Sequence, residues 1–150
     1  MHILDIVTIV CIGLLIGNEA AVSLFINPAL WKLDEQSQAS TISLFARSLG
    51  KAMPFWYVLS FLLLLVEVWL YRHQPAFTPL LVAAALWIAV ILFTILFLLP
   101  INNRVAAWQP DALPAGWHRA HKKWDTLHRW RVLVLTIAFV CLTWGILRAC

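Results

Sequence analysis

Residues 77–99 read FTPLLVAAALWIAVILFTILFLL and contain no charged side chain. An α-helix rises about 1.5 Å per residue, so roughly 20 apolar residues cross the hydrocarbon core of a bilayer. This stretch is longer than that, and an apolar run of such length predicts a transmembrane helix. Pro100 follows directly, and we expect it to end the helix because proline has no backbone N–H to donate.

Three further stretches have the same apolar character. We expect them to span the bilayer at about residues 3–30, 54–71 and 125–147, with Pro28 bending or ending the first. The connection at residues 72–75 is short, which makes the helices on either side of it antiparallel neighbours. The last helix is expected to begin near Trp117, ahead of its apolar half. The sequence therefore predicts an all-α integral membrane protein, a four-helix bundle forming a single domain over residues 1–150.

Residues 34–50 have a more polar pattern than the spans. Asp34 is suited to cap a helix, and apolar residues recur after it at helical spacing. Gly50 can stop that helix and Pro54 can start the next one. We expect a short amphipathic helix at about residues 34–50, lying at the membrane interface between spans one and two. An ordered polar loop is the alternative.

Composition supports a membrane protein. Hydrophobic residues make up 63% of the chain and charged residues 12%, whereas soluble domains have about 45–50% and about 25%. The first apolar run has no basic residue before it and no clear cleavage site after it, so we expect it to be retained. The predicted partner is the lipid bilayer, and self-association into oligomers is left open.

The basic residues are concentrated beside the spans. The connections after the first and third spans hold most of them, whereas the opposite side holds only Arg72 and Arg148. By the positive-inside rule, the connections are expected to be cytoplasmic and both termini outward, with a bacterial inner membrane as the location. No nucleic-acid motif accompanies the charge, so no nucleic-acid partner is expected. The basic residues of the two connections are Lys32, Arg47, Lys51, Arg104, Arg119, Lys122, Lys123, Arg129 and Arg131.

Two carboxyl groups fall inside predicted spans. Glu19 lies late in the first span, and Glu67 lies late in the second with Tyr71 four residues after it. Ionisable groups are expensive at bilayer depth and need partners or water. One interpretation is that both carboxyls lie near the interface, paired or hydrated. The other is that they point into a shared cavity, where they bind a substrate or carry protons.

The last helix carries the densest set of polar side chains. His118, His121, Asp125 and His128 fall within an arc of about 80° on one face. Imidazole is both a common metal ligand and a proton carrier near neutral pH. No HExxH motif is present, so a metal site would need further ligands from another helix. For His118 and His121, contact with lipid headgroups is the alternative.

Several short motifs resemble those of the anthrone oxygenase-like family of membrane proteins. The sequence Leu-Pro-Ile-Asn-Asn at residues 99–103 is followed by a final-helix pattern of Trp124, His128 and Arg131. Residues 27–30 and 50–54 are similar to its early motifs. The resemblance implies a four-helix membrane protein. Some members insert oxygen into activated, electron-rich aromatic carbon without a classical cofactor, while many have no known function.

The resemblance assigns roles to individual residues. Asn102 and Asn103 match the turn motif, and Trp124, His128 and Arg131 match the final helix. Asp125 stands where many relatives have Asn, which adds a negative charge.

The first hypothesis is an oxygenase-like enzyme acting on a lipophilic aromatic, phenolic or quinol-like substrate, with no cofactor expected. His128 would be the general base, Arg131 would stabilise an oxyanion, and Asn103 would orient a substrate oxygen. Trp124 would form an apolar wall.

Two other hypotheses remain open. In one, His121, Asp125 and His128 bind iron or copper, with Glu19 or Glu67 completing the coordination from another helix. In the other, the protein is a non-enzymatic carrier, quinone-binding subunit or assembly partner, and the two intramembrane glutamates form a proton or ion path.

Overall fold

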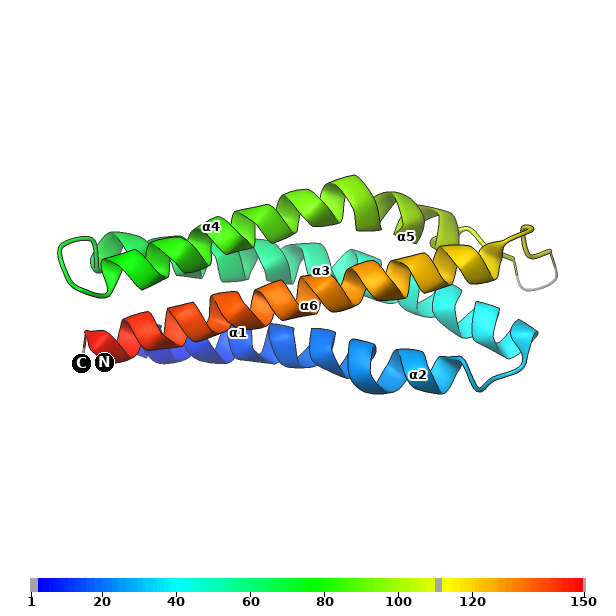
Figure 1. The fold of residues 1–150 in the computed structure, drawn as a ribbon, viewed down its shortest axis with the longest axis horizontal. Helices are drawn as coiled ribbons and strands as arrows, with labels where there is room; N and C mark the ends of the chain where they lie inside the picture. The colour runs from blue at the N-terminus through cyan, green and yellow to red at the C-terminus, as the bar shows by residue number, and fades with distance from the viewer. Residues whose placement is uncertain (1–2, 110–111, 150) are drawn as a thin grey trace.

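The chain folds into four long antiparallel helical rods (Figure 1), and the computed structural model describes residues 3–109 and 112–149. Each rod is long and apolar enough to cross a membrane. The predicted all-α four-helix bundle is therefore confirmed. In chain order the elements are α1 (Ile3–Ala21), η1 (Val22–Ile26), α2 (Asn27–Leu30), α3 (Glu35–Leu70), α4 (Phe77–Phe93), η2 (Thr94–Leu98), α5 (Leu99–Ala106) and α6 (Trp117–Arg148).

The two termini lie at the same end of the bundle, together with the turn between α3 and α4 (Figure 1). The opposite end holds the connection between α2 and α3 and the connection that precedes α6. The last helix begins at Trp117, as the sequence predicts. The short turn makes α3 and α4 antiparallel neighbours, also as predicted.

The bundle turns many of its apolar side chains outward. Large aliphatic residues such as Leu14, Leu62 and Val140 are more than half exposed, and similar residues are exposed along all four rods. Several polar side chains are buried instead, among them Asp5, Thr8 and Glu67. Water would not tolerate so extensive an apolar surface, whereas lipid does. The chain is an integral membrane protein.

The interior between α4 and α6 is tightly packed. Leu80 and Trp87 of α4 and Leu142 of α6 are almost fully buried in one apolar cluster. Gly145 allows this close approach, because a Cβ at its position would lie 3.0 Å from the Leu80 Cγ and 3.3 Å from the Ala76 carbonyl oxygen. Small residues at such contacts let helix backbones approach each other within a membrane.

The predicted separation of an interfacial helix at residues 34–50 from a span at 54–71 is wrong. One continuous helix, α3, runs from Glu35 to Leu70 with Pro54 inside it. Asp34 does cap this helix, since its side chain accepts a hydrogen bond from the Ser37 N–H, which lowers the Asp34 pKa. Gly50 does not act as a stop. It leaves room for another rod, because a Cβ there would lie 3.1 Å from the Asn102 Nδ2.

The first and third rods continue past their prolines through turns of π-helix. η1 ends two residues before Pro28, and η2 ends two residues before Pro100. In each turn the residue before the proline donates its N–H to a carbonyl five residues back, from Asn27 to Val22 and from Leu99 to Thr94. A wider turn relieves the clash of the proline ring with the preceding turn.

The prediction that Pro100 ends the third span is therefore wrong. α5 continues this rod to Ala106. The first rod passes Pro28 as well but ends soon after it, because α2 extends only to Leu30, close to where the sequence predicts.

Replacing Gly145 with Val should destabilise the protein by about 1–3 kcal/mol, because the added side chain overlaps Leu80 and the α4 backbone. Gly17→Val is the matched control, since no atom lies within 4 Å of the corresponding Cβ position. The control should change stability by less than about 0.5 kcal/mol. Thermal unfolding of the purified proteins in one detergent measures both. Equal unfolding temperatures for the two variants would contradict the close packing of α4 and α6.

Candidate functional site

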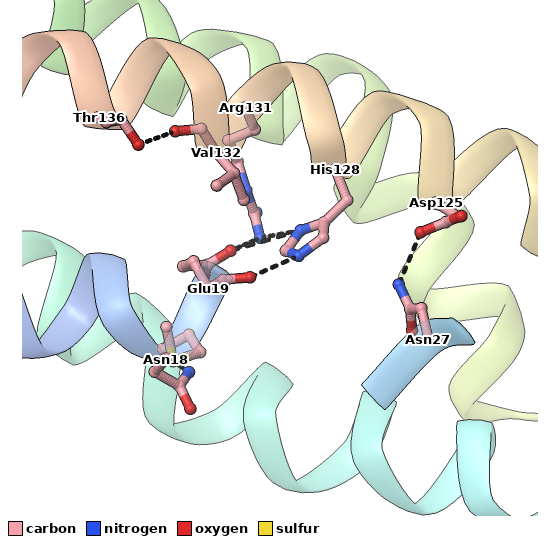
Figure 2. A network of polar contacts seen from close by, with 9 residues as sticks. Asn18, Glu19, Asn27, Asp125, His128, Arg131, Val132 and Thr136 are labelled. Carbon is pink, nitrogen blue, oxygen red and sulfur yellow. Dashed lines mark hydrogen bonds and ion pairs between the residues drawn. The ribbon is translucent and has the colours of Figure 1, made fainter. Parts of the chain in front are cut away.

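A buried polar cluster joins α1 to α6. The Arg131 Nη2 lies 2.5 Å from the Glu19 Oε2 and 2.9 Å from the His128 Nδ1 (Figure 2). The Glu19 Oε2 is also 3.4 Å from the His128 Nδ1. The side chains of Glu19, His128 and Arg131 are 3%, 2% and 10% exposed, so the ion pair and the imidazole are shielded from solvent together.

The contacts of His128 define which of its ring nitrogens carries a proton. The Nε2 lies 3.2 Å from the Glu19 backbone oxygen, and a carbonyl oxygen can only accept a hydrogen bond. The Arg131 guanidinium can only donate. The Nε2 therefore carries the hydrogen, and the Nδ1 presents its lone pair to Arg131. His128 is a neutral imidazole whose basic nitrogen is covered by a guanidinium.

Helical spacing places the Trp124 side chain beside the His128 imidazole. Trp124 lies one turn before His128 on α6, and Arg131 lies one turn after it, so all three share one face. The Trp124 and His128 rings are stacked, with centroids 4.6 Å apart and planes inclined by 12°. Stacking on a bulky neighbour restricts the rotation of the imidazole.

The cluster forms one wall of a cavity of about 300 Å³ between the rods. Both π-helical turns contribute to the lining, through Val22 of η1 and through Thr94, Ile95 and Leu98 of η2. Such turns recur at functional sites in other helical proteins. Most other lining residues are apolar, and the polar ones are Asn18, Glu19, Tyr57, Thr94, Asn102, His128 and Arg131.

Two lining residues, Tyr57 and Thr94, were not predicted from the sequence. The Tyr57 hydroxyl lies near Glu19 and Arg131. Neither this hydroxyl nor the Thr94 hydroxyl has a hydrogen-bond partner among the described residues. The Arg131 Nε is also buried without a partner among the described residues. Buried polar atoms are normally paired, so these three atoms suit a ligand that carries oxygen. The sequence feature that could have identified Tyr57 and Thr94 is a hydroxyl group within an otherwise apolar span.

The turn motif contributes one of its two asparagines to the cavity. Asn102 lines it, and its Nδ2 lies 3.4 Å from the Ala46 carbonyl oxygen. Asn103 is exposed and does not line the cavity. Asp125 lies outside the cavity as well, where it accepts hydrogen bonds from Asn27 at 2.8 Å and Arg129 at 3.1 Å.

The second predicted carboxyl lies in a different cluster. Glu67 accepts a hydrogen bond of 2.8 Å from Thr8, and the Tyr71 hydroxyl donates to the Asp5 carboxylate at 3.0 Å. Glu67 and Tyr71 do not line the cavity that contains Glu19. The two intramembrane glutamates therefore serve separate polar contacts.

The described residues do not form a cluster of potential metal ligands. Over residues 3–109 and 112–149, no group of three or more His, Cys, Asp or Glu side chains could hold a metal ion. The three predicted ligands make separate contacts. His121 packs on Trp31, Asp125 accepts a hydrogen bond from Asn27, and His128 bonds to the Glu19 backbone oxygen. The iron or copper hypothesis remains a prediction.

Comparison with known families supports the resemblance seen in the sequence. The model of the anthrone oxygenase family matches residues 42–141, two thirds of the chain. The chain belongs to the anthrone oxygenase family. The matched region contains Asn102, Trp124, His128 and Arg131 of the cavity and does not include Glu19.

Neither the curated proteins nor the solved structures include a match to this chain. Membership of the anthrone oxygenase family does not by itself establish an activity, because one fold can host many functions.

Replacing Glu19 with Leu should destabilise the protein by about 3–5 kcal/mol, because it leaves the Arg131 charge buried without its partner. The double variant Glu19→Leu/Arg131→Met should regain much of that stability, since it removes both charges. Glu35→Gln is the control, because the Glu35 side chain is 74% exposed. Thermal unfolding in one detergent compares all three. A double variant no more stable than Glu19→Leu would show that the ion pair does not couple the two rods.

Proposed function

We propose that this chain is a membrane oxygenase that acts on a lipophilic aromatic, phenolic or quinol-like substrate bound in the 300 Å³ cavity. The observation that carries the proposal is the position of His128, whose Nδ1 lies 2.9 Å from the Arg131 Nη2 at the wall of a mostly apolar cavity. A cavity of mostly apolar lining with a few convergent polar groups is the usual form of a small-molecule site. The match to the anthrone oxygenase family supports the same class of reaction.

The mostly apolar lining of the cavity suits an aromatic substrate. Aliphatic side chains such as Val58, Ile91 and Leu98 would pack against the rings, and Trp124 would close one side. The hydroxyls of Tyr57 and Thr94 would pair with substrate oxygens. Asn102 takes the orienting role first expected of Asn103, because Asn102 is the member of the pair that lines the cavity.

His128 would act as the general base. A substrate carbonyl oxygen that accepts the Arg131 N–H draws it away from the His128 Nδ1, and this uncovers the lone pair. The Nδ1 then removes a proton from the activated carbon, which leaves an enolate whose oxygen is stabilised by Arg131. The Glu19 carboxylate, 3.4 Å from the Nδ1, stabilises the imidazolium that forms.

The oxidation balances with molecular oxygen as the only co-substrate. The carbanion form of the enolate adds oxygen to give a peroxide anion, which takes back the proton from the His128 imidazolium. Loss of water from the resulting hydroperoxide leaves a carbonyl group. The sum is R₂CH₂ + O₂ → R₂C=O + H₂O, in which carbon is oxidised and both oxygen atoms are reduced. One oxygen atom enters the product, so the reaction is that of a monooxygenase, and it requires no added reductant.

The proposed function includes an orientation of the bundle in the membrane. We place the two connections at the end opposite the termini on the cytoplasmic side of a bacterial inner membrane, because most of the basic residues lie there. The cavity then lies in the half of the bundle nearer the cytoplasm, where a lipophilic substrate can arrive through the bilayer.

Replacing His128 with Ala should lower kcat by about 10²–10⁴-fold, because it removes the base while leaving the cavity in place. An anthrone, whose central CH₂ lies between two aromatic rings, is the probe. Oxygen uptake and quinone formation are measured with detergent-solubilised protein. His118→Ala is the control, since His118 is half exposed and lies outside the cavity. With ¹⁸O₂, one labelled atom should appear in the new carbonyl group.

Unchanged turnover in the folded His128→Ala variant would remove His128 from this role. Binding of the anthrone by the wild-type protein without any oxygen uptake would contradict an oxygenase. That result would favour the alternative of a carrier or quinone-binding subunit.

A further inference from the structure

A second, smaller cavity of about 70 Å³ adjoins the first. The two cavities share Val22, Leu49, Asn102 and Trp124 in their linings. The smaller one is otherwise lined by residues from the end of the bundle opposite the termini, namely Ile26, Asn27, Leu30, Ile42, Phe45, Ala46, Val105 and His121. No charged side chain among the described residues lines it.

His121 is the polar group without a partner in this smaller cavity. The residue is 2% exposed, and its Nε2 is buried with no hydrogen bond to any described residue. The Trp31 ring packs on it, with centroids 4.8 Å apart. A buried imidazole nitrogen that has lost water and gained no partner is unfavourable by about 1–3 kcal/mol. The site therefore favours a ligand that hydrogen-bonds to the Nε2.

The position of His121 relates it to the proposed base. His121 and His128 lie seven residues apart on α6, which places them on the same face and roughly 10 Å apart along the axis. Trp124 lies between them and borders both cavities. A rigid aromatic molecule with its reacting carbon at His128 can therefore extend one end past Trp124 toward His121.

We propose that the smaller cavity is a specificity subsite, in which the His121 Nε2 hydrogen-bonds a hydroxyl group at the end of the substrate distant from the reacting carbon. This inference rests on the proposed function and narrows its substrate to a phenol. A hydroxyl can donate to or accept from an imidazole nitrogen, so it fits either tautomer. A carboxylate is disfavoured because the cavity supplies no cation, and the Asn27 amide is already bonded to Asp125.

The test compares two anthrones that differ only in one outer-ring hydroxyl. Their Kd values are measured without oxygen, by equilibrium dialysis against protein in lipid nanodiscs. The wild-type protein should bind the hydroxylated probe about ten-fold more tightly, the effect of one buried hydrogen bond. Partition of each probe into empty nanodiscs of the same lipid is measured and subtracted, so the Kd ratio of each protein reports the site alone.

His121→Phe keeps a ring against Trp31 and removes the nitrogen, so the Kd ratio should fall to about one. His121→Gln, which can still donate and accept, should retain part of the preference. His118→Phe is the matched control one turn away, and its ratio should equal that of the wild type. If the Phe variant does not fold, the His121→Leu variant replaces it.

A wild-type ratio near one would overturn the subsite, because a cavity filled only by water gives no preference. A ratio that survives the removal of the His121 nitrogen would also overturn it. The proposed function is judged separately. His128→Ala should lose turnover and keep the wild-type ratio, whereas a wild-type protein that oxidises both probes but binds them equally refutes the subsite alone. If the wild type binds neither probe, both proposals are wrong.

Discussion

The rest of the site depends on the ion pair between Glu19 and Arg131. A lone charge within an apolar bundle is strongly unfavourable, and each of these groups is tolerated because the other lies within hydrogen-bond distance. The pair ties the first rod to the fourth across 112 positions of sequence. It also sets the state of His128, because the same guanidinium covers the imidazole lone pair. Charge balance, helix pairing and the protonation state of the imidazole thus have a common origin.

The sequence predicted the rods better than it predicted their interruptions. Apolar length and the short 72–75 connection are local properties, and they were sufficient for the four-helix bundle. The prolines were harder to interpret. Pro54 sits within α3, and Pro100 is carried through by a π-helical turn. Whether a proline ends a helix depends on how the surrounding rods pack, and that is not visible in the residues next to it.

The candidate site also combines residues that could be predicted from the sequence with residues that could not. Trp124, His128 and Arg131 were predictable because they share one face of one helix, where spacing alone brings them together. Their partner on the first rod was not assignable, because no spacing rule connects Glu19 with a residue on another helix. Of the two intramembrane glutamates, only Glu19 joins the cavity, while Glu67 bonds to Thr8. Tyr57 was missed because an uncharged hydroxyl barely disturbs the apolar pattern.

The two π-helical turns also divide the first and third rods into segments whose faces are rotated relative to each other. A π turn holds about one residue more than an α turn, and one residue in a helix corresponds to about 100° of rotation. Deleting a single residue from η1 would therefore swing Glu19 away from α6 while the residues beyond Pro28 kept their contacts. The orientation of the polar wall thus depends on the extra residue in η1, because the same rotation would also turn the buried Asp5 and Thr8 of α1 toward lipid.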